Sequence, residues 1–138
     1  MCKVGDLILV DHYKHGENTV SRHTFVVVND DNGEIRGLSY DFIANALSSF
    51  KSPEQKERKM GYPGNFPLVA SDMVMNPNNG KSAYVKTDQL YYFNKSTLNY
   101  VVIGHIDQDI MDLIFEFIKE SVENGDFEFE EITDNLEP

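Results

Sequence analysis

An arginine and a histidine stand side by side at the start of an apolar, β-branched run in the first third of the chain. Arg22 and His23 precede residues 25–28, which read Phe-Val-Val-Val and end at the turn residues 29–33. A short run of this kind predicts a strand buried on both faces. An arginine held at the start of such a strand is suited to bind phosphate through two parallel hydrogen bonds from its planar guanidinium group. The alternative is a surface arginine whose stem lies along the strand end.

Two histidines and a lysine gather just upstream, in residues 12–20. His12, Lys14 and His15 stand beside Gly16, and we expect this segment to be a polar loop. Histidine titrates near neutral pH, so these side chains suit proton transfer or phosphate contacts. No CxxC or HExxH-type spacing accompanies them, and we therefore expect neither a metal site nor a cofactor.

A basic cluster and a set of tyrosines allow two interpretations each. The cluster is Lys51, Lys56, Arg58 and Lys59, interleaved with Glu54 and Glu57. It is either a solvated mixed-charge helix surface or a contact for an RNA backbone. The tyrosines are Tyr84, Tyr91, Tyr92 and Tyr100. They either pack the core or, where exposed, stack on bases.

Alternating and continuous apolar runs predict a mainly β protein. The expected strands cover residues 4–11, 25–28, 34–40, 68–71, 82–86, 89–93 and 100–104. The strand over 34–40 should form a hairpin with the strand over 25–28, with Gly37 at a bulge. That pairing would bring the hydroxyl of Ser39 close to Arg22.

Helical spacing predicts two helices and one further turn. Apolar residues at 42, 43, 46, 47 and 50 favour a short helix, and Ser52-Pro53 favours a turn after it. Asp107 should cap an amphipathic helix through residue 119 that ends at Asn124-Gly125. Residues 61–67 and 75–81, rich in Gly, Pro and Asn, are expected to be loops.

Size and composition favour one domain over residues 1–124. The chain has 138 residues, 41% of them hydrophobic, and a mean hydropathy of -0.41. The sequence shows neither a secretory h-region nor an apolar run long enough to cross a bilayer. Its single cysteine, Cys2, excludes an internal disulfide framework and favours a cytoplasmic location.

Negative charge is concentrated at the C-terminus. The net charge is -11, and residues 120–138 hold eight acidic residues and no lysine or arginine. The rest of the chain, with 15 acidic and 12 basic residues, is nearly neutral and can present a local basic groove. Residues 125–138 are expected to be a flexible acidic tail. A second hypothesis is that this tail folds over an RNA groove as an internal mimic.

The order of these segments resembles the MazF/PemK toxins of bacterial type II toxin–antitoxin systems. The similar stretches are residues 5–10, 21–30, 61–69, 82–90 and 103–107. The resemblance implies an α+β, mainly β fold. It would be an SH3-like small β-barrel with a short inserted helix and a C-terminal amphipathic helix. It also implies a homodimer that is neutralised by an antitoxin protein and contacts operator DNA only through the antitoxin complex.

The family resemblance also implies metal-independent cleavage of single-stranded mRNA by attack of the ribose 2′-OH. Arg22 would stabilise the phosphorane and Ser39 would hydrogen-bond the scissile phosphate. Arginine is a poor base, so the proton-transfer group stays open among His23, His15 and His12. The RNA-binding candidates are His12, Lys14, His15, Arg36, Lys56, Arg58, Lys59, Tyr62 and Lys81.

Three departures from the family pattern leave alternatives open. His23 stands where the family usually has proline, residues 42–60 are longer than usual, and the acidic tail is an addition. The alternatives are a non-enzymatic toxin of the same fold that binds a protein such as DNA gyrase, and a catalytically silent RNA-binding relative. Arg22 and the absence of tryptophan disfavour the gyrase-type alternative.

Overall fold

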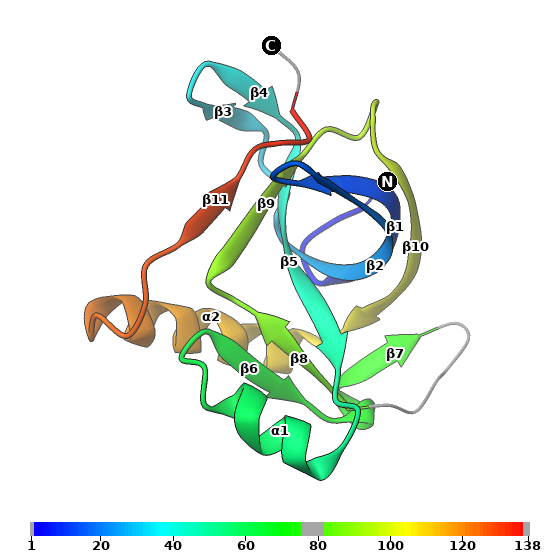
Figure 1. Cartoon of the computed structure of the whole chain (residues 1–138). Helices are drawn as coiled ribbons and strands as arrows, with labels where there is room; N and C mark the ends of the chain where they lie inside the picture. The colour runs from blue at the N-terminus through cyan, green and yellow to red at the C-terminus, as the bar shows by residue number, and fades with distance from the viewer. Residues whose placement is uncertain (1, 76–81, 137–138) are drawn as a thin grey trace.

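One strongly bent sheet of nine strands organises the chain (Figure 1). The structure, a computed structural model, describes residues 2–75 and 82–136. Its strands are β1 (Asp6–His15), β2 (Asn18–Asn29), β3 (Gly33–Ile35), β4 (Leu38–Tyr40), β5 (Phe42–Ser49), β6 (Asn65–Leu68), β7 (Met73–Met75), β8 (Ala83–Lys86), β9 (Gln89–Phe93), β10 (Asn99–Ile106) and β11 (Glu130–Ile132). Its helices are α1 (Pro53–Met60) and α2 (Gln108–Glu123), with a 3₁₀ turn, η1 (Ala70–Asp72).

The strand order of the large sheet is β11-β9-β5-β2-β1-β10-β7, with β8 paired to β5 and β6 paired to β8. Over the described residues the two end strands, β11 and β7, do not pair with each other, so this sheet does not close into a barrel. The prediction of a mainly β fold is confirmed, as is that of a C-terminal helix, which is α2.

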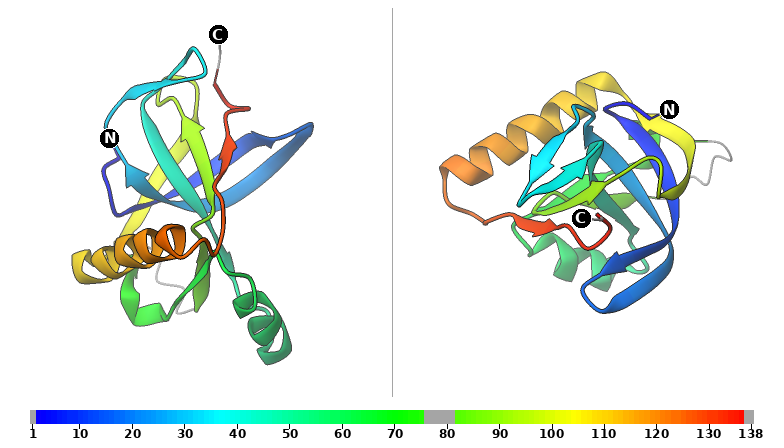
Figure 2. Two further views of the ribbon diagram at one scale, coloured as in Figure 1. Left: turned by 90° about the vertical axis from the view of Figure 1, so that its left-hand side faces the viewer. Right: turned by 90° about the horizontal axis from the view of Figure 1, so that it is seen from above.

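The segment expected to be a polar loop, residues 12–20, is instead the tip of a long hairpin. β1 and β2 pair from Leu7↔Val26 out to His15↔Asn18, and Gly16 turns the chain with a φ of +64°. The hairpin projects from the body of the molecule (Figure 2). The polar residues of this segment are therefore held on two paired strands and not on a free loop.

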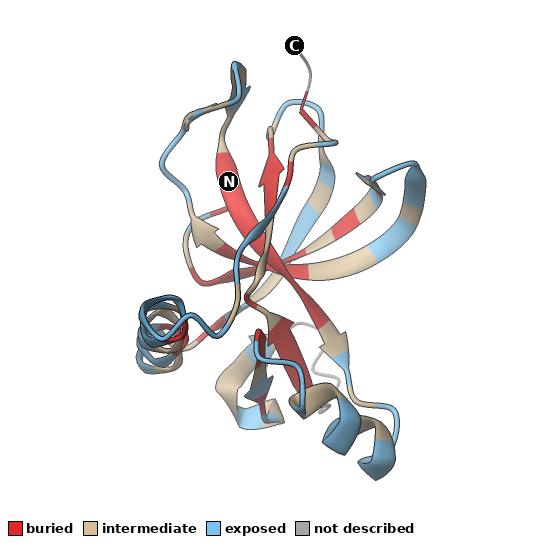
Figure 3. Cartoon of the chain, turned by 60° about the vertical axis from the view of Figure 1, so that its left-hand side comes forward, coloured by how far each residue is buried: buried red, intermediate tan, exposed pale blue. Residues whose placement is uncertain are grey.

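The prediction of a helix over residues 42–50 is wrong, because this segment is the central strand β5. Residues 42–47 are all buried, and Figure 3 shows the buried stretch along β5. Phe42, Ala44 and Ala46 pack into one core cluster, whereas Leu47 packs into another on the opposite face. A strand covered on both faces has a continuous apolar run, and periodicity cannot distinguish that run from a short buried helix.

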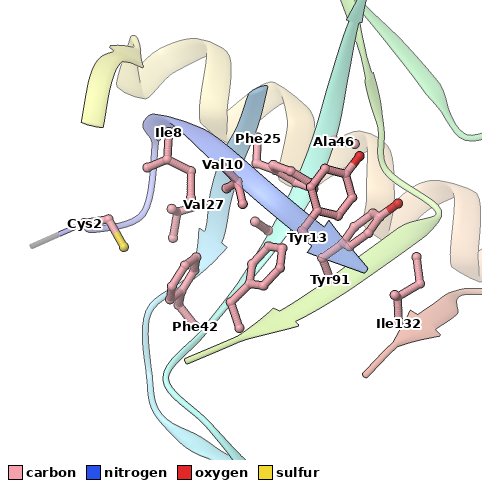
Figure 4. Packing of buried hydrophobic residues seen from close by; sticks show 12 residues of the cluster. Cys2, Ile8, Val10, Tyr13, Phe25, Val27, Phe42, Ala46, Tyr91 and Ile132 are labelled. Carbon is pink, nitrogen blue, oxygen red and sulfur yellow. The ribbon is translucent and has the colours of Figure 1, made fainter. Parts of the chain in front are cut away.

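Aromatic rings fill the core cluster inside the bend of the sheet (Figure 4). Phe25 lies at its centre, with ring centroids of Tyr13 and Tyr91 each 4.9 Å away and that of Phe93 at 5.3 Å. Tyr84, Tyr91 and Tyr92 are buried, which confirms the core interpretation for these three tyrosines.

Helix α2 covers the other face of the sheet, as its amphipathic pattern predicts. Met111 and Ile114 are buried against Leu7 and Val26. Asp107 occupies the N-cap position, although its side chain makes no capping hydrogen bond. The predicted end is confirmed: the helix is capped at Asn124, and Gly125 follows with a φ of +72°.

Helix α1 begins as the sequence predicts, with Ser52 accepting a hydrogen bond from the backbone N–H of Gln55 at 3.0 Å. None of its residues is buried. The strand expected over residues 68–71 is wrong in position, since β6 ends at Leu68 and η1 follows it. The expected turn over residues 75–81 falls outside the described residues apart from Met75.

The segment over residues 34–40 forms its own small hairpin, β3–β4, and does not pair with β2. Arg36 and Gly37 connect the two strands with φ values of 52° and 80°. Positive φ at both central residues is typical of a tight two-residue turn. Gly37 is thus part of the turn and not of a bulge within a longer strand.

The acidic C-terminal segment differs from the flexible tail that the sequence favours. β11 pairs in parallel with β9, and Ile132 and Leu136 are buried. Figure 1 shows this segment running beside β9 toward the β3–β4 hairpin. We call residues 130–136 the C-terminal strap. Among the described residues, no helix has both the length and the apolar character needed to cross a membrane.

Candidate functional site

The two residues that open the predicted site, Arg22 and His23, lie on opposite faces of β2 because they are consecutive in a strand. Thr24 pairs with Leu47 on β5. The pairing of β2 with β5 ends at this pair, and Ser48 and Ser49 pair with Tyr84 and Ala83 of β8 on the other edge of β5.

Ser39 does not lie beside Arg22, so the expected pairing of these two residues is wrong. Ser39 is on β4, where it pairs with Glu34, and its backbone carbonyl accepts a hydrogen bond from Asn94. The strand that does run beside β2 is β5. The reason is that residues 33–40 turn back on themselves before the chain rejoins the large sheet.

Arg22 forms a three-residue polar cluster with Asp11 and His12 on the outside of the hairpin. The Nη2 atom of Arg22 lies 3.6 Å from Oδ2 of Asp11, and Nδ1 of His12 lies 3.1 Å from Oδ1 of the same carboxylate. The side chains of Arg22 and His12 are 66% and 69% exposed. An exposed ion pair contributes only about 0.2–1 kcal/mol, so the guanidinium can exchange Asp11 for a phosphate.

His12 has a left-handed backbone, with a φ of 59°, in the middle of β1. A non-glycine residue in this region costs of order 1 kcal/mol or more, and such residues concentrate at functional sites. Asp11 can accept the Nδ1–H of His12, which would leave Nε2 as the basic nitrogen facing solvent. The cluster thus combines an oriented imidazole with an exposed guanidinium.

His23 lies on the inner face, half-buried against the rings of Tyr13 and Phe25, with centroids 6.3 and 5.8 Å away. Its Nε2 atom is buried and has no hydrogen-bond partner among the described residues. Burial, aided by the charge of Lys86, lowers the pKa of His23, and a hydrogen bond with the Leu47 backbone opposes this shift. The lowered pKa and the buried Nε2 atom of His23 favour His12 for proton transfer.

The depressed pKa of His23 predicts a pH-dependent stability. Because the unfolded chain binds a proton more readily than the folded chain below the ordinary pKa of 6.5, the free energy of unfolding should fall as the pH is lowered through that value. The free energy of unfolding, measured in urea at pH 7.5 and 5.0, should drop less between these two pH values in the His23→Gln variant than in the unchanged protein. The same change at the exposed His105 should leave the drop unaltered.

A basic and aromatic groove lies between α1 and β8. It encloses about 210 Å³ and is lined by Lys59, Tyr62, Asn65, Tyr84, Lys86, Asp88 and Gln89. The Lys59 ammonium lies 5.5 Å from the ring centroid of Tyr62, and Lys56 lies 5.6 Å from that of Phe50. None of the ion pairs formed within residues 2–75 and 82–136 involves these lysines or Lys86.

The groove is connected to β5 through β8. Tyr84, which lines the groove, pairs with Ser48 of β5. Lysine ammonium groups beside an exposed aromatic ring, here that of Tyr62, are features that bind single-stranded nucleic acid.

The predicted RNA-binding residues fall into two groups. Lys56, Arg58, Lys59 and Tyr62 lie on or beside α1 at the groove. His12, Lys14, His15 and Arg36 lie far along the sheet, where the last three contact the C-terminal strap. Lys81 lies outside the described residues.

Sequence reasoning did not identify Asp11 or Lys86 as site residues. Asp11 and His12 directly follow the apolar run of β1, and this adjacency was an available signal. The sequence offers Tyr84 for base stacking only if it is exposed, and the structure buries it. Among the described residues, no group of three or more His, Cys, Asp or Glu side chains is placed to hold a metal ion.

Comparisons with known proteins identify no relative. Neither a protein-family model, nor a curated protein, nor a solved structure matches this chain.

Proposed function

We propose that this protein binds single-stranded RNA and cleaves it by metal-independent attack of the ribose 2′-OH. The observation that carries the proposal is the exposed Asp11–His12–Arg22 cluster on the β1–β2 hairpin, and the basic, aromatic groove between α1 and β8 supports it. Arginine, lysine and aromatic side chains supply phosphate binding and base stacking. An imidazole beside them supplies the proton transfer.

His12, Asp11 and Arg22 each have a separate role in the proposed cleavage. His12 Nε2 accepts the proton of the 2′-OH while Asp11 holds the ring through Nδ1. The 2′-oxygen then bonds to phosphorus and the bond from phosphorus to O5′ breaks. The products are a 2′,3′-cyclic phosphate and a 5′-hydroxyl, whose oxygen takes a proton from water. Arg22 stabilises the phosphorane charge, a role that preorganised donors fill in many enzymes.

Ser39 lies on the β3–β4 hairpin, where it pairs with Glu34, so the proposal assigns it no contact with the scissile phosphate. The phosphate contact is assigned to the exposed guanidinium of Arg22.

The finer fold and the partners are part of the same proposal. A bent sheet whose central strands are covered on both faces supports an SH3-like barrel of the MazF/PemK type. Val74 on β7 and Val101 on β10 are exposed apolar side chains on paired strands, and they support a homodimer. A toxin of this type would be neutralised by an antitoxin protein.

A second candidate function is RNA binding without cleavage. It is favoured by the separation of Ser39 from Arg22 and by the buried position of His23 Nε2, which remove two of the residues expected to act in catalysis. The groove is unaffected by either finding.

Incubation with a fluorescent single-stranded RNA of mixed sequence in EDTA tests these candidates together. Cleavage that leaves a cyclic phosphate is the result expected for the first candidate. Binding without cleavage would identify the second. Inertness toward RNA, combined with growth arrest on expression in bacteria, would instead indicate a toxin with a protein target.

The groove itself makes a separate prediction. The double variant Lys59→Ala/Lys86→Ala should bind RNA at least about tenfold more weakly. The slope of the logarithm of the binding constant against the logarithm of the salt concentration should become shallower by roughly 1.4, because each lost phosphate contact removes about 0.7. Fluorescence anisotropy over a range of salt concentrations measures both quantities. Lys95→Ala/Lys119→Ala removes the same charge elsewhere and should change the affinity little; equal losses in both variants would contradict the assigned groove.

A further inference from the structure

The C-terminal strap lies over the tip of the β1–β2 hairpin and the outer edge of β9. Residues 130–132 pair with residues 89–91, and the strap then continues past the hairpin tip. Two buried apolar side chains anchor the strap. Ile132 is 3% exposed in the aromatic core cluster, and Leu136 is 8% exposed beside Ile43 and Tyr92.

Two carboxylates of the strap contact His15 and Arg36, which the sequence assigns to RNA binding. Glu130 Oε2 lies 3.5 Å from His15 Nε2, and Glu131 Oε1 accepts a hydrogen bond from Arg36 Nη2 at 3.0 Å. The other oxygen of Glu131 accepts from the Tyr92 hydroxyl at 3.0 Å. Burial and this carboxylate raise the pKa of Tyr92 to about 12, so the phenol remains a donor.

Further along, the strap binds the backbone of the hairpin tip. Asp134 accepts the N–H of Gly16 at 2.9 Å. Asn135 accepts the N–H of Lys14 at 2.6 Å and donates to the Lys14 carbonyl at 2.9 Å. Two carboxylates and an amide therefore occupy the side of the hairpin where a polyanion would meet His15 and Lys14.

The strap also forms one wall of a hollow beside the proposed catalytic histidine. This hollow encloses about 160 Å³ and is lined by His12, Lys14, Thr97, Leu98, Asp134, Asn135 and Leu136. Removing the strap would open the hollow on the side of His12. The proposed reaction needs RNA close to this residue.

Beside its two buried anchors, the strap is held by polar attachments that are individually weak. Its paired strand is three residues long, and the side chains of both ion pairs are between 37% and 57% exposed. Exposed pairs of this kind are weak and salt-dependent. The strap is joined to α2 by a short connection, so it is present at a high effective concentration even though each contact is small.

From these contacts we infer that the C-terminal strap is an autoinhibitory segment, which competes with RNA for His15, Lys14, Arg36 and the hollow beside His12. The inference rests on the proposed function and adds to it a form of regulation within the chain. RNA bound first at the groove would displace the strap as it extends toward the hairpin. The apparent affinity is reduced by the fraction of molecules in which the strap is seated.

Two charge-matched variants of the full chain test the inference. The strap variant is Glu130→Gln/Glu131→Gln/Asp134→Asn. The control is Glu123→Gln/Asp126→Asn/Glu128→Gln, whose residues are exposed and form none of the ion pairs among the described residues. The probe is a fluorescent 2′-O-methyl RNA 12-mer of mixed sequence, which cannot be cleaved. We expect the strap variant to bind it at least about fivefold more tightly than the unchanged chain, and the control by less than twofold.

Amide hydrogen exchange at residues 89–91 and 130–132 reports strap release without reference to RNA. Faster exchange in the strap variant with no gain in affinity would overturn the inference, as would an equal gain in both variants. If exchange stays slow in the strap variant, the Leu136→Asp variant is used instead, because it removes an apolar anchor of the strap. Faster exchange in Leu136→Asp with no gain in RNA affinity would likewise overturn the inference.

The two hypotheses fail in different ways. RNA binding that is lost in Lys59→Ala/Lys86→Ala but unaffected by strap release would retain the proposed function and refute autoinhibition. Failure of all variants to bind RNA would refute the proposed function, and the competition with it.

Discussion

Replacing Arg22 by alanine is expected to reduce RNA cleavage by about 10²–10³-fold. The phosphorane carries more negative charge than the bound phosphate diester, so a guanidinium at this position stabilises the transition state more than the ground state. We therefore expect the loss mainly in kcat, with a smaller effect on RNA affinity. Single-turnover cleavage of a fluorescent RNA in EDTA measures the chemical step directly.

The structure indicates that this variant will fold. The Arg22 side chain is 66% exposed, and its one ion pair, with Asp11, spans 3.6 Å. Surface substitutions of this kind usually change stability by less than about 0.5 kcal/mol. Lys119→Ala removes the same charge on α2 and serves as the control. Arg22→Lys keeps the charge but loses the planar fork, so an intermediate rate is expected. Full cleavage by Arg22→Ala would rule out the proposed catalytic role.

The largest expected effect on stability is that of Phe25→Ala, a loss of about 3–5 kcal/mol in the free energy of unfolding. Phe25 is fully buried on β2, and its ring meets those of Tyr13, Tyr91 and Phe93 edge-on at centroid distances of 4.9–5.3 Å. The substitution removes these contacts and leaves a cavity among rigid rings that have little freedom to close it.

Urea denaturation followed by circular dichroism measures this change. Phe129→Ala removes the same atoms from a side chain that is 38% exposed, and it should cost less than about 1 kcal/mol. A loss below about 2 kcal/mol for Phe25→Ala would mean that the aromatic cluster does not dominate the core. Because Phe25 also supports His23 at 5.8 Å, a destabilised variant should show a weaker pH dependence of unfolding.

Local sequence patterns predicted some of the elements well. The amphipathic stripe and the Asn124-Gly125 stop define α2, and Ser52-Pro53 marks the start of α1. The strands β8 and β9 and the apolar part of β1 also follow from short-range pattern. In each case one side of the element faces solvent or a turn interrupts it, so its period or its ends are visible in the sequence.

Elements whose environment is set by distant residues could not be assigned from local pattern. Residues 42–47 are covered on both faces, so β5 has no period that separates it from a helix. The same residues decide which strand lies beside β2. Because that strand is β5, Ser39 on the β3–β4 hairpin does not lie beside Arg22.

What the sequence determined by itself is the chemical inventory: an arginine and histidine at a strand end, a basic cluster near residue 56, and an acidic, apolar-interleaved C-terminus. Only the tertiary structure decided which members of that inventory meet. Antiparallel pairing of β1 with β2 brings Asp11 to Arg22, eleven residues later. Burial of Ile132 and Leu136 brings the strap to the hairpin tip, more than a hundred residues away in sequence. These contacts depend on strand register and on apolar burial between distant segments, which a local pattern does not contain.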